Sequence, residues 1–214
     1  MENEGGYIPL TEQAQAFISG HVQEGDGAID ATVGNGHDTA FLARLVGAGG
    51  KVFGFDIQPA AIETAREKLA RLGLARRVEW ICDCHGKLAR HIPEDWHGRI
   101  QAVMINLGYL PGSDKRITTH PRTTLAALSQ ALDLLSPTGR ISIIAYTGHG
   151  GGQEEANAIG QWLATRLPGQ RRWRRVVPGG RRSPPQLFLI GQGQPPTDRQ
   201  CDNPKKKLVP ATTP

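Results

Sequence analysis

The segment Asp30-Ala-Thr-Val-Gly34-Asn-Gly36-His-Asp-Thr39 decides the fold of this 214-residue chain. It follows the apolar residues Ala28 and Ile29 and precedes an apolar-periodic segment, so the pattern predicts a strand, a tight turn and a helix. The two glycines let the backbone turn sharply and approach a ligand, which the first amides of the helix would face. The segment therefore predicts a ligand site at the turn.

A second predicted strand, Lys51–Phe55, ends in the acidic residue Asp56. A carboxylate at this place, about twenty residues after the glycine turn, can accept hydrogen bonds from both hydroxyls of a ribose. Gln58, in the loop that follows, could reach the adenosine. The two motifs together predict a cofactor that contains a nucleoside.

Strand and helix patterns alternate along the rest of the chain. Further strands are predicted at Gly27–Thr32, Arg77–Ile81, Ile100–Asn106, Arg140–Tyr146, Arg174–Val177 and Gln186–Ile190. Helices are predicted at Thr39–Val46, Ala60–Leu72, Gly86–His91, Thr123–Leu135 and Gln153–Leu167. One more amphipathic helix, around Ala14–Val22, either covers the cofactor side or only packs on the domain. This alternation favours an α/β fold with a doubly wound, mostly parallel seven-stranded sheet.

The connection between the last two predicted strands is too short for a helix, so these strands should form an antiparallel hairpin at one edge of the sheet. This reversal distinguishes a Rossmann-like class I methyltransferase from an ordinary dinucleotide-binding fold. We expect residues 1–191 to form this domain. Residues 192–214 are rich in Pro, Gln and Lys and are expected to form a basic, disordered tail.

The composition limits the cellular location and the binding partners that we expect for the chain. The formal net charge is +5, and basic residues gather near residues 171–182 and 205–207, which suits a polyanion such as RNA. No apolar run is long enough to span a membrane and the N-terminus has no secretory pattern, so a cytoplasmic location is expected. Three cysteines are too few for a disulfide framework.

The residues around the glycine turn favour S-adenosylmethionine over a dinucleotide. Thr39 stands where a dehydrogenase would carry its third glycine, and Asp30 closes the strand ahead of the turn. A carboxylate there can orient the loop or meet the ammonium group of S-adenosylmethionine, whereas it would repel a pyrophosphate. An NAD-dependent oxidoreductase and an RNA-binding module without catalysis stay open as less favoured alternatives.

The segment Cys82-Asp83-Cys84-His85 follows the third strand in the sheet. In a class I methyltransferase this position flanks the adenine, so Asp83 could accept hydrogen bonds from the amino group while Cys84 and His85 lie beside the cofactor. Four adjacent candidate ligands rarely converge on one ion, and no second cluster accompanies them, so no metal is expected.

Loops after the fourth and fifth strands carry the predicted catalytic residues. The loop Asn106-Leu-Gly-Tyr109-Leu-Pro-Gly-Ser-Asp-Lys115 offers an asparagine, backbone carbonyls and an aromatic ring beside the transferred methyl group. Such a loop can accept hydrogen bonds from an amine and orient its lone pair, and orientation supplies much of the rate in methyl transfer. Tyr146 or His149, after the next strand, or a loop carbonyl could assist deprotonation, although His149 could equally contact a phosphate or only begin a helix.

A basic hairpin near the C-terminus is a candidate RNA-binding surface. It sets one aromatic residue among several arginines, namely Arg171, Arg172, Trp173, Arg174, Arg181 and Arg182. The arginines could contact phosphates while Trp173 stacks on a base or ribose. A solvated strand face is the alternative interpretation.

Taken together, these segments resemble one family, the bacterial proteins long labelled rRNA methylases and now known as MnmM-type tRNA methyltransferases. The resemblance covers roughly residues 10–190. It rests above all on Asn106-Leu-Gly-Tyr-Leu-Pro-Gly, supported by Gly54-Phe-Asp-Ile-Gln58, Thr123-Thr124 and Tyr146-Thr-Gly-His-Gly-Gly. It implies an S-adenosylmethionine-dependent enzyme that methylates the amine of 5-aminomethyl-(2-thio)uridine at wobble position 34, giving the 5-methylaminomethyl form. The implied partner is the anticodon stem-loop of tRNA, and a homodimer is compatible with the sequence.

The resemblance also assigns individual residues. It implies that the cofactor is contacted by Asn35, Asp38, Asp56, Gln58 and His85. It implies that the substrate side is lined by Asn106, Tyr109, Lys115, Tyr146 and His149. The chain departs from the family at Gly179-Gly180-Arg181, where similar proteins carry an Asn-Gln pair, and at Cys84, where glycine is common. Substrate contacts from the last hairpin therefore stay open, as do rRNA or another amine as the substrate.

Overall fold

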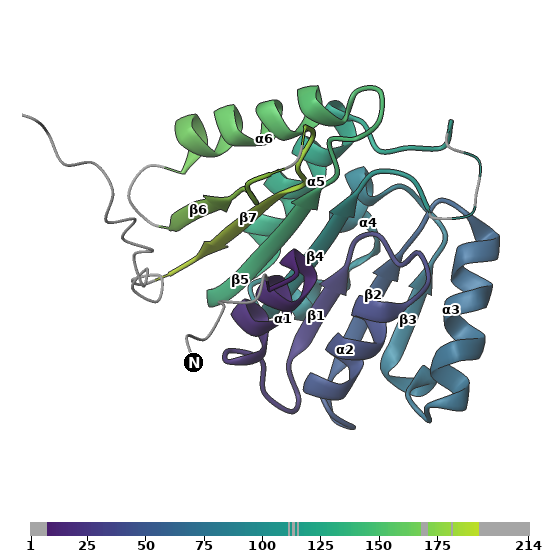
Figure 1. Cartoon of the computed structure of the whole chain (residues 1–214). Helices are drawn as coiled ribbons and strands as arrows, with labels where there is room; N and C mark the ends of the chain where they lie inside the picture. Colours follow the sequence, from purple (N-terminus) through teal and green to yellow (C-terminus); the bar gives the residue numbers. More distant parts are fainter. Residues whose placement is uncertain are drawn as a thin grey trace, which may run out of the picture.

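The helices and strands of the computed structural model follow the predicted alternation (Figure 1). The structure describes residues 8–110, 112, 114, 116–167, 171–180 and 182–192, so the predicted tail lies outside it except for Gln192. The strands are β1 (Gly27–Asp30), β2 (Lys51–Phe55), β3 (Val78–Ile81), β4 (Ile100–Leu107), β5 (Leu135–Ala145), β6 (Arg172–Val176) and β7 (Gln186–Gly191). The helices are α1 (Leu10–Ser19), α2 (His37–Leu45), α3 (Pro59–Arg71), α4 (Leu88–His91), α5 (Pro121–Leu134) and α6 (Gly152–Arg166). Short 3₁₀ turns lie at Ala75–Arg77, His85–Lys87 and Glu94–Trp96.

The strands form one sheet in the order β3-β2-β1-β4-β5-β7-β6. The first five strands pair in parallel, whereas β7 pairs antiparallel with both β5 and β6. β7 therefore lies inside the sheet and β6 forms its edge. The predicted doubly wound, mostly parallel sheet with an antiparallel C-terminal hairpin is confirmed.

β5 begins earlier than the predicted Arg140. Ile100 pairs with Leu135 and Ala102 pairs with Arg140, so residues 136–139 form an irregularity between two paired stretches of one strand. Pro and Gly within this segment give it the pattern of a turn, which is why the sequence predicts a later start.

Helices cover both faces of the sheet and bury an apolar core on each side. On the face of α1, α2 and α3, Val52 packs in one cluster with Leu42. On the face of α4, α5 and α6, Phe53 packs in a second cluster with Leu128 and Ile159. Neighbouring residues of β2 thus serve opposite cores, as the alternation of side chains along a strand requires. Among the described helices, none is long and apolar enough to span a membrane.

α1 is tied to a strand from the far half of the chain. Nη1 of Arg140 in β5 donates a hydrogen bond to the carbonyl oxygen of Phe17 at 2.7 Å. The same guanidinium lies over the Phe17 ring, 4.4 Å from its centre, and such a cation–ring contact is stabilising. α1 is therefore held against β5.

Candidate active site

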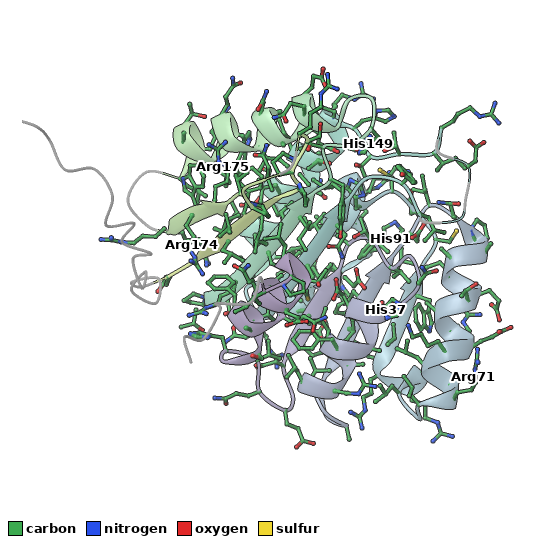
Figure 2. The ribbon with its side chains drawn as sticks, in the orientation of Figure 1. His37, Arg71, His91, His149, Arg174 and Arg175 are labelled. Atoms are coloured by element: carbon green, nitrogen blue, oxygen red, sulfur yellow. The ribbon has the colours of Figure 1, made fainter. Side chains whose placement is uncertain are left out.

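The carboxyl ends of the parallel strands open into a cavity of about 920 Å³. Ligands bind at this edge of open α/β sheets, and small-molecule sites span roughly 300–1,000 Å³. Figure 2 shows His37 toward the α2 side of this edge and His149 toward the α6 side. The predicted site residues that line the cavity are Gly34, Asn35, Asp38, Asp56, Gln58, Asp83, Cys84, His85, Asn106, Tyr109, Tyr146 and His149. The structure thus brings the predicted donor and substrate residues together.

Asp30 shapes the glycine turn from beneath and is not among the residues that line the cavity. Its carboxylate is fully buried and accepts hydrogen bonds from Thr39 Oγ1 at 2.6 Å and from the amide of Thr32 at 3.1 Å. The Thr39 that replaces a third glycine is therefore the partner of this carboxylate. Of the two predicted roles for Asp30, the structure supports the orientation of the loop.

Gly36 is also absent from the cavity wall, because it faces α3. Its φ is 70°, in the left-handed region that favours glycine. A Cβ atom at this position would lie 2.8 Å from the Cβ of Ala65. The second glycine of the turn is thus required by close packing against α3, whereas Gly34 is the glycine that borders the cavity.

Asp56 joins the loops after β1 and β2. Its Oδ2 accepts a hydrogen bond from the amide of Gly34 and its Oδ1 accepts one from the amide of Gln58, both at 2.9 Å. Gln58 is the N-cap of α3 and Pro59 occupies its first turn, a position that proline favours. The Asp56 carboxylate is therefore fixed at the cavity wall, with further lone pairs available for hydroxyl groups.

The segment after β3 forms a polar wall around Asp83. Its carboxylate accepts hydrogen bonds from Lys87 Nζ at 2.7 Å, from His91 Nε2 at 3.0 Å and from the amide of Cys84 at 2.7 Å. These partners, Lys87 first, hold the pKa of Asp83 well below its usual range. Burial lowers the pKa of His85 to about 4, so this ring is neutral at pH 7, and its buried Nε2 meets no hydrogen-bond partner among the described residues.

The lining of the donor side is acidic, because it includes Asp38, Asp56 and Asp83. Just beneath it, burial and then the Asp38 carboxylate raise the pKa of Asp30 to about 7. Carboxylates around a partly enclosed cavity favour a cationic ligand. No group of three or more potential ligands in the described part of the chain is arranged to hold a metal ion. S-adenosylmethionine, with its sulfonium and ammonium groups, fits this lining.

Asn106 is held by two side chains from the neighbouring β1–α2 region. Its Nδ2 donates a hydrogen bond to Asp38 Oδ2 at 2.6 Å, and its backbone amide donates one to Thr32 Oγ1 at 2.7 Å. The other oxygen of Asp38 accepts a hydrogen bond from Gln15 Nε2 at 2.9 Å. Elements α1, α2 and β4 therefore meet at a single buried carboxylate.

Aromatic side chains form the wall opposite the donor side. The rings of Tyr109 and His149 meet edge to face with their centres 5.8 Å apart, and Tyr109 pairs with Thr118 across its loop. His149 Nδ1 lies 3.0 Å from the carbonyl oxygen of Gly150, so Nδ1 donates this hydrogen bond, and the buried Nε2 has no hydrogen-bond partner among the described residues. Tyr146, which is 43% exposed, completes this wall.

Several cavity residues escaped the sequence analysis. α1 contributes Thr11 and Gln15, which supports the interpretation that this helix covers the cofactor side. Thr119 lines the cavity as well, and its Oγ1 donates a hydrogen bond at 2.7 Å to Glu155, a buried carboxylate that lies behind the lining and also accepts one from Thr124 Oγ1 at 2.6 Å. Other missed lining residues are Thr32, Ile57, Leu110, Ile117, Thr118, His120, Thr123, Ser183 and Pro185. Hydroxyl-bearing residues in loops give too weak a sequence signal to be distinguished from ordinary turn residues.

The basic hairpin contains both buried and exposed arginines. Arg171 donates hydrogen bonds to the carbonyl oxygens of Gly139 and Ser136, both at 2.8 Å, and burial lowers its pKa. This arginine therefore stabilises the irregular part of β5, and its predicted contact with a phosphate stays a prediction. Arg172 is exposed, as are Arg175 and Arg182.

The remaining members of the predicted RNA surface have mixed environments. Trp173 is half-buried, with its ring 6.3 Å from that of Phe188, so one face of the indole serves the core. Arg174 is half-buried as well, and Figure 2 shows it on β6 beside Arg175. The predicted contacts of Lys115 and Arg181 lie outside the described residues.

Fold and cavity together define a class I, S-adenosylmethionine-dependent methyltransferase. Residues 52–189 match the sequence model of the family described as "Putative rRNA methylase", and the chain belongs to this family. The crystal structure of a "putative rRNA-methylase" from Clostridium thermocellum is 40% identical, with a TM-score of 0.82 over 87% of this chain and 98% of that one.

Two further relatives carry more chemical information. A "putative methyltransferase" from Streptococcus mutans, solved with S-adenosylhomocysteine, is 34% identical, with a TM-score of 0.77 over 87% of this chain and 99% of that one. An Arabidopsis thaliana protein named tRNA (mnm(5)s(2)U34)-methyltransferase, chloroplastic, is 40% identical over 162 residues. That match covers 72% of this chain but only 58% of the Arabidopsis protein.

Proposed function

We propose that this enzyme methylates the amine of 5-aminomethyl-(2-thio)uridine at wobble position 34 of tRNA, giving the 5-methylaminomethyl nucleoside. The observation that carries the proposal is the shared cavity in which acidic donor-side residues and the Asn106 loop occur together. The name of the Arabidopsis relative supports the choice of nucleoside. The anticodon stem-loop is then the part of the tRNA that docks at the cavity.

The donor would be held by residues from three strand ends. S-adenosylmethionine, when bound, supplies a methyl group on a positively charged sulfur. Asp56, fixed by the amides of Gly34 and Gln58, would accept hydrogen bonds from the ribose hydroxyls. Asp83 and the neutral His85 would lie on the adenine side, at the end of β3. In this arrangement the carboxylates of the lining favour binding of the positively charged donor.

The acceptor amine must be neutral and must point its lone pair along the line of attack. Asn106 would accept a hydrogen bond from the amine through its side-chain oxygen, which leaves the lone pair free to face the methyl group. Tyr109 and Tyr146 would border the uridine. Tyr146 or His149, which line the same cavity, would assist deprotonation of the amine.

The exposed arginines would contact the tRNA backbone. Ser183 and Pro185 line the cavity, so the connection between β6 and β7 carries Arg182 to its border. Arg172 and Arg175 extend basic character along the edge strand. Phosphate contacts of this kind position an RNA without reading its sequence.

Nucleoside analysis tests the proposal. The purified enzyme would be incubated with labelled S-adenosylmethionine and tRNA from cells that lack the final methylation. We expect the label in 5-methylaminomethyl-(2-thio)uridine and a matching loss of the aminomethyl nucleoside in mass spectrometry. Label in rRNA or in a small amine instead would identify a different substrate. A rise in melting temperature with NAD but not with S-adenosylmethionine would contradict methyl transfer altogether.

A further inference from the structure

We propose that Asp38 is a positioning residue which, together with Gln15, fixes the orientation of the Asn106 side-chain amide. In this orientation the Asn106 oxygen faces the acceptor amine and its nitrogen faces Asp38. The inference rests on the proposed function, because it concerns how the amine is received. It gives Asp38 a role different from the direct cofactor contact that the sequence predicts, and it brings in Gln15, which the sequence analysis does not single out.

The direction of each hydrogen bond follows from the chemistry of the groups. An ionised carboxylate has no hydrogen to donate, so both of its partners must present donors. Asp38 Oδ2 lies 2.6 Å from Asn106 Nδ2, and Oδ1 lies 2.9 Å from Gln15 Nε2. With only 8% of Asp38 exposed, few water molecules can compete for these sites. Asp38 therefore holds the NH₂ group of Asn106 toward its own carboxylate.

The backbone of Asn106 is also held in place, and the oxygen of its side-chain amide is left for a ligand. Thr32 Oγ1 accepts a hydrogen bond from the Asn106 backbone amide at 2.7 Å, which holds the end of β4 in place. Within the described part of the chain, no donor reaches Asn106 Oδ1, and Asn106 lines the cavity. The side-chain oxygen is thus the group that Asn106 offers to a ligand.

The orientation matters because the two ends of an amide have opposite polarity. An oxygen facing the amine accepts an N–H and leaves the nitrogen lone pair free for the methyl group. A flipped amide would present its own N–H groups, which would bind the lone pair and withdraw it from the reaction. Misorientation of a reacting group costs about 100-fold in rate in other enzymes, so a flip should affect turnover strongly.

Two matched double variants test the proposal by forcing the amide each way. In Gln15→Glu with Asp38→Asn, the carboxylate introduced at position 15 can only accept a hydrogen bond, so it binds the NH₂ group of the asparagine introduced at position 38. The oxygen of that asparagine then faces Asn106 and accepts from its NH₂ group, which keeps Asn106 in its native orientation. In Gln15→Lys with Asp38→Asn, the ammonium introduced at position 15 can only donate, so it binds the oxygen of the asparagine at position 38. The NH₂ group of that asparagine then faces Asn106, whose amide must flip to present its oxygen. Both proteins lack the Asp38 carboxylate and differ at one position.

We expect the first variant to retain most of the wild-type turnover and the second to lose ~10- to 100-fold in kcat, with both measured at saturating S-adenosylmethionine so that the changed charge of the cavity does not enter the comparison. Gln15→Lys alone should lose less turnover than the second double variant, because the Asp38 carboxylate still accepts from both neighbours. The loss should therefore be strongly non-additive. Equal turnover of the two double variants would overturn the proposal, and so would weak donor binding in both, since that would make Asp38 a direct cofactor ligand.

Two controls separate this inference from the proposed function. If the wild-type enzyme leaves the aminomethyl nucleoside of tRNA unchanged, the proposed function fails. The amide orientation is then still tested by the side-chain NH₂ resonances of Asn106, which should differ much more between the two double variants than between wild type and the first. Should the lysine variant not fold by circular dichroism, Gln15→Arg with Asp38→Asn supplies a second donor-only partner with the same expected loss. Unchanged Asn106 resonances in a folded donor-only variant would count against the proposal.

Discussion

Oγ1 of Thr39 lies 2.6 Å from Oδ2 of Asp30, and both side chains are fully buried beneath the glycine turn. A carboxylate in this position is stabilised by the hydroxyl but destabilised by its lack of water, and the second effect is larger, since the pKa of Asp30 rises to about 7. The turn that borders the donor cavity is therefore built on a group that titrates near neutral pH.

The stability of the ligand-free protein should fall as the pH rises toward 7. The raised pKa means that, between about pH 4 and pH 7, the folded state binds more protons at Asp30 than the unfolded state does. This contribution to stability is complete below pH 4 and is lost as the pH passes through 7. Asp30→Asn should flatten the dependence of Tm on pH across this window in scanning calorimetry. The exposed Asp95→Asn is the control, and a slope that survives in Asp30→Asn would refute the assignment.

Replacing Asp56 by alanine should weaken the binding of S-adenosylmethionine while the domain stays folded. The carboxylate holds two loop amides and, in our proposal, the ribose, and hydrogen bonds to a charged group are worth about 1.5–3 kcal/mol. We expect a Kd about 10- to 100-fold higher in titration calorimetry. Glu63→Ala, on the exposed side of α3, should leave the Kd unchanged. An unchanged Kd in Asp56→Ala would remove this residue from the donor site.

Gly36→Ala should destabilise the protein more than Gly73→Ala. Both glycines have a φ of 70°, so both substitutions carry the same backbone strain. Only Gly36 has a close neighbour, with Ala65 Cβ 2.8 Å from the added Cβ, whereas nothing lies within 4 Å at Gly73. Overpacking of this kind costs about 1–3 kcal/mol beyond the strain, measurable in urea unfolding. Adding Ala65→Gly should recover part of the loss, and equal effects at the two glycines would exclude the packing explanation.

Arg171 and Arg172 should have separate effects despite being adjacent. Arg171→Ala removes two hydrogen bonds to β5 carbonyls and should lower Tm. Arg172→Ala, at an exposed position, should leave Tm unchanged and weaken tRNA binding. The slope of log K against log salt concentration should then become shallower by about 0.7–0.9 for each phosphate that the variant no longer binds. A salt dependence identical to wild type would take Arg172 out of the RNA interface.

The sequence predicts the sheet well because its signals are local. Glycines at the turn, Asp56 after β2 and short strands between amphipathic helices are each visible within a few residues. The start of β5 is missed because the Pro and Gly of residues 136–139 mimic a turn, and only pairing with β4 makes the segment part of a strand.

Side-chain roles that depend on distant partners are harder to predict. Arg171 looks like its neighbours in the sequence, and only its contact with residues about thirty positions earlier makes it structural. In the sequence, Thr39 is notable only because it replaces a glycine. Its hydrogen bond to Asp30 becomes visible only once the turn is folded. Gln15 belongs to an ordinary amphipathic helix until α1 docks beside Asp38.

The docking of α1 also has a consequence for the order of folding. α1 emerges before the strands of the sheet during synthesis, but Arg140, which anchors it through Phe17, is made more than 100 residues later. Contacts of such large sequence separation form late, because loop closure must precede them. Thr11 and Gln15 therefore join the donor cavity only after the central sheet exists. Binding of S-adenosylmethionine should accordingly report completion of the whole domain, and a nascent chain with a finished glycine turn should still be unable to hold its donor firmly.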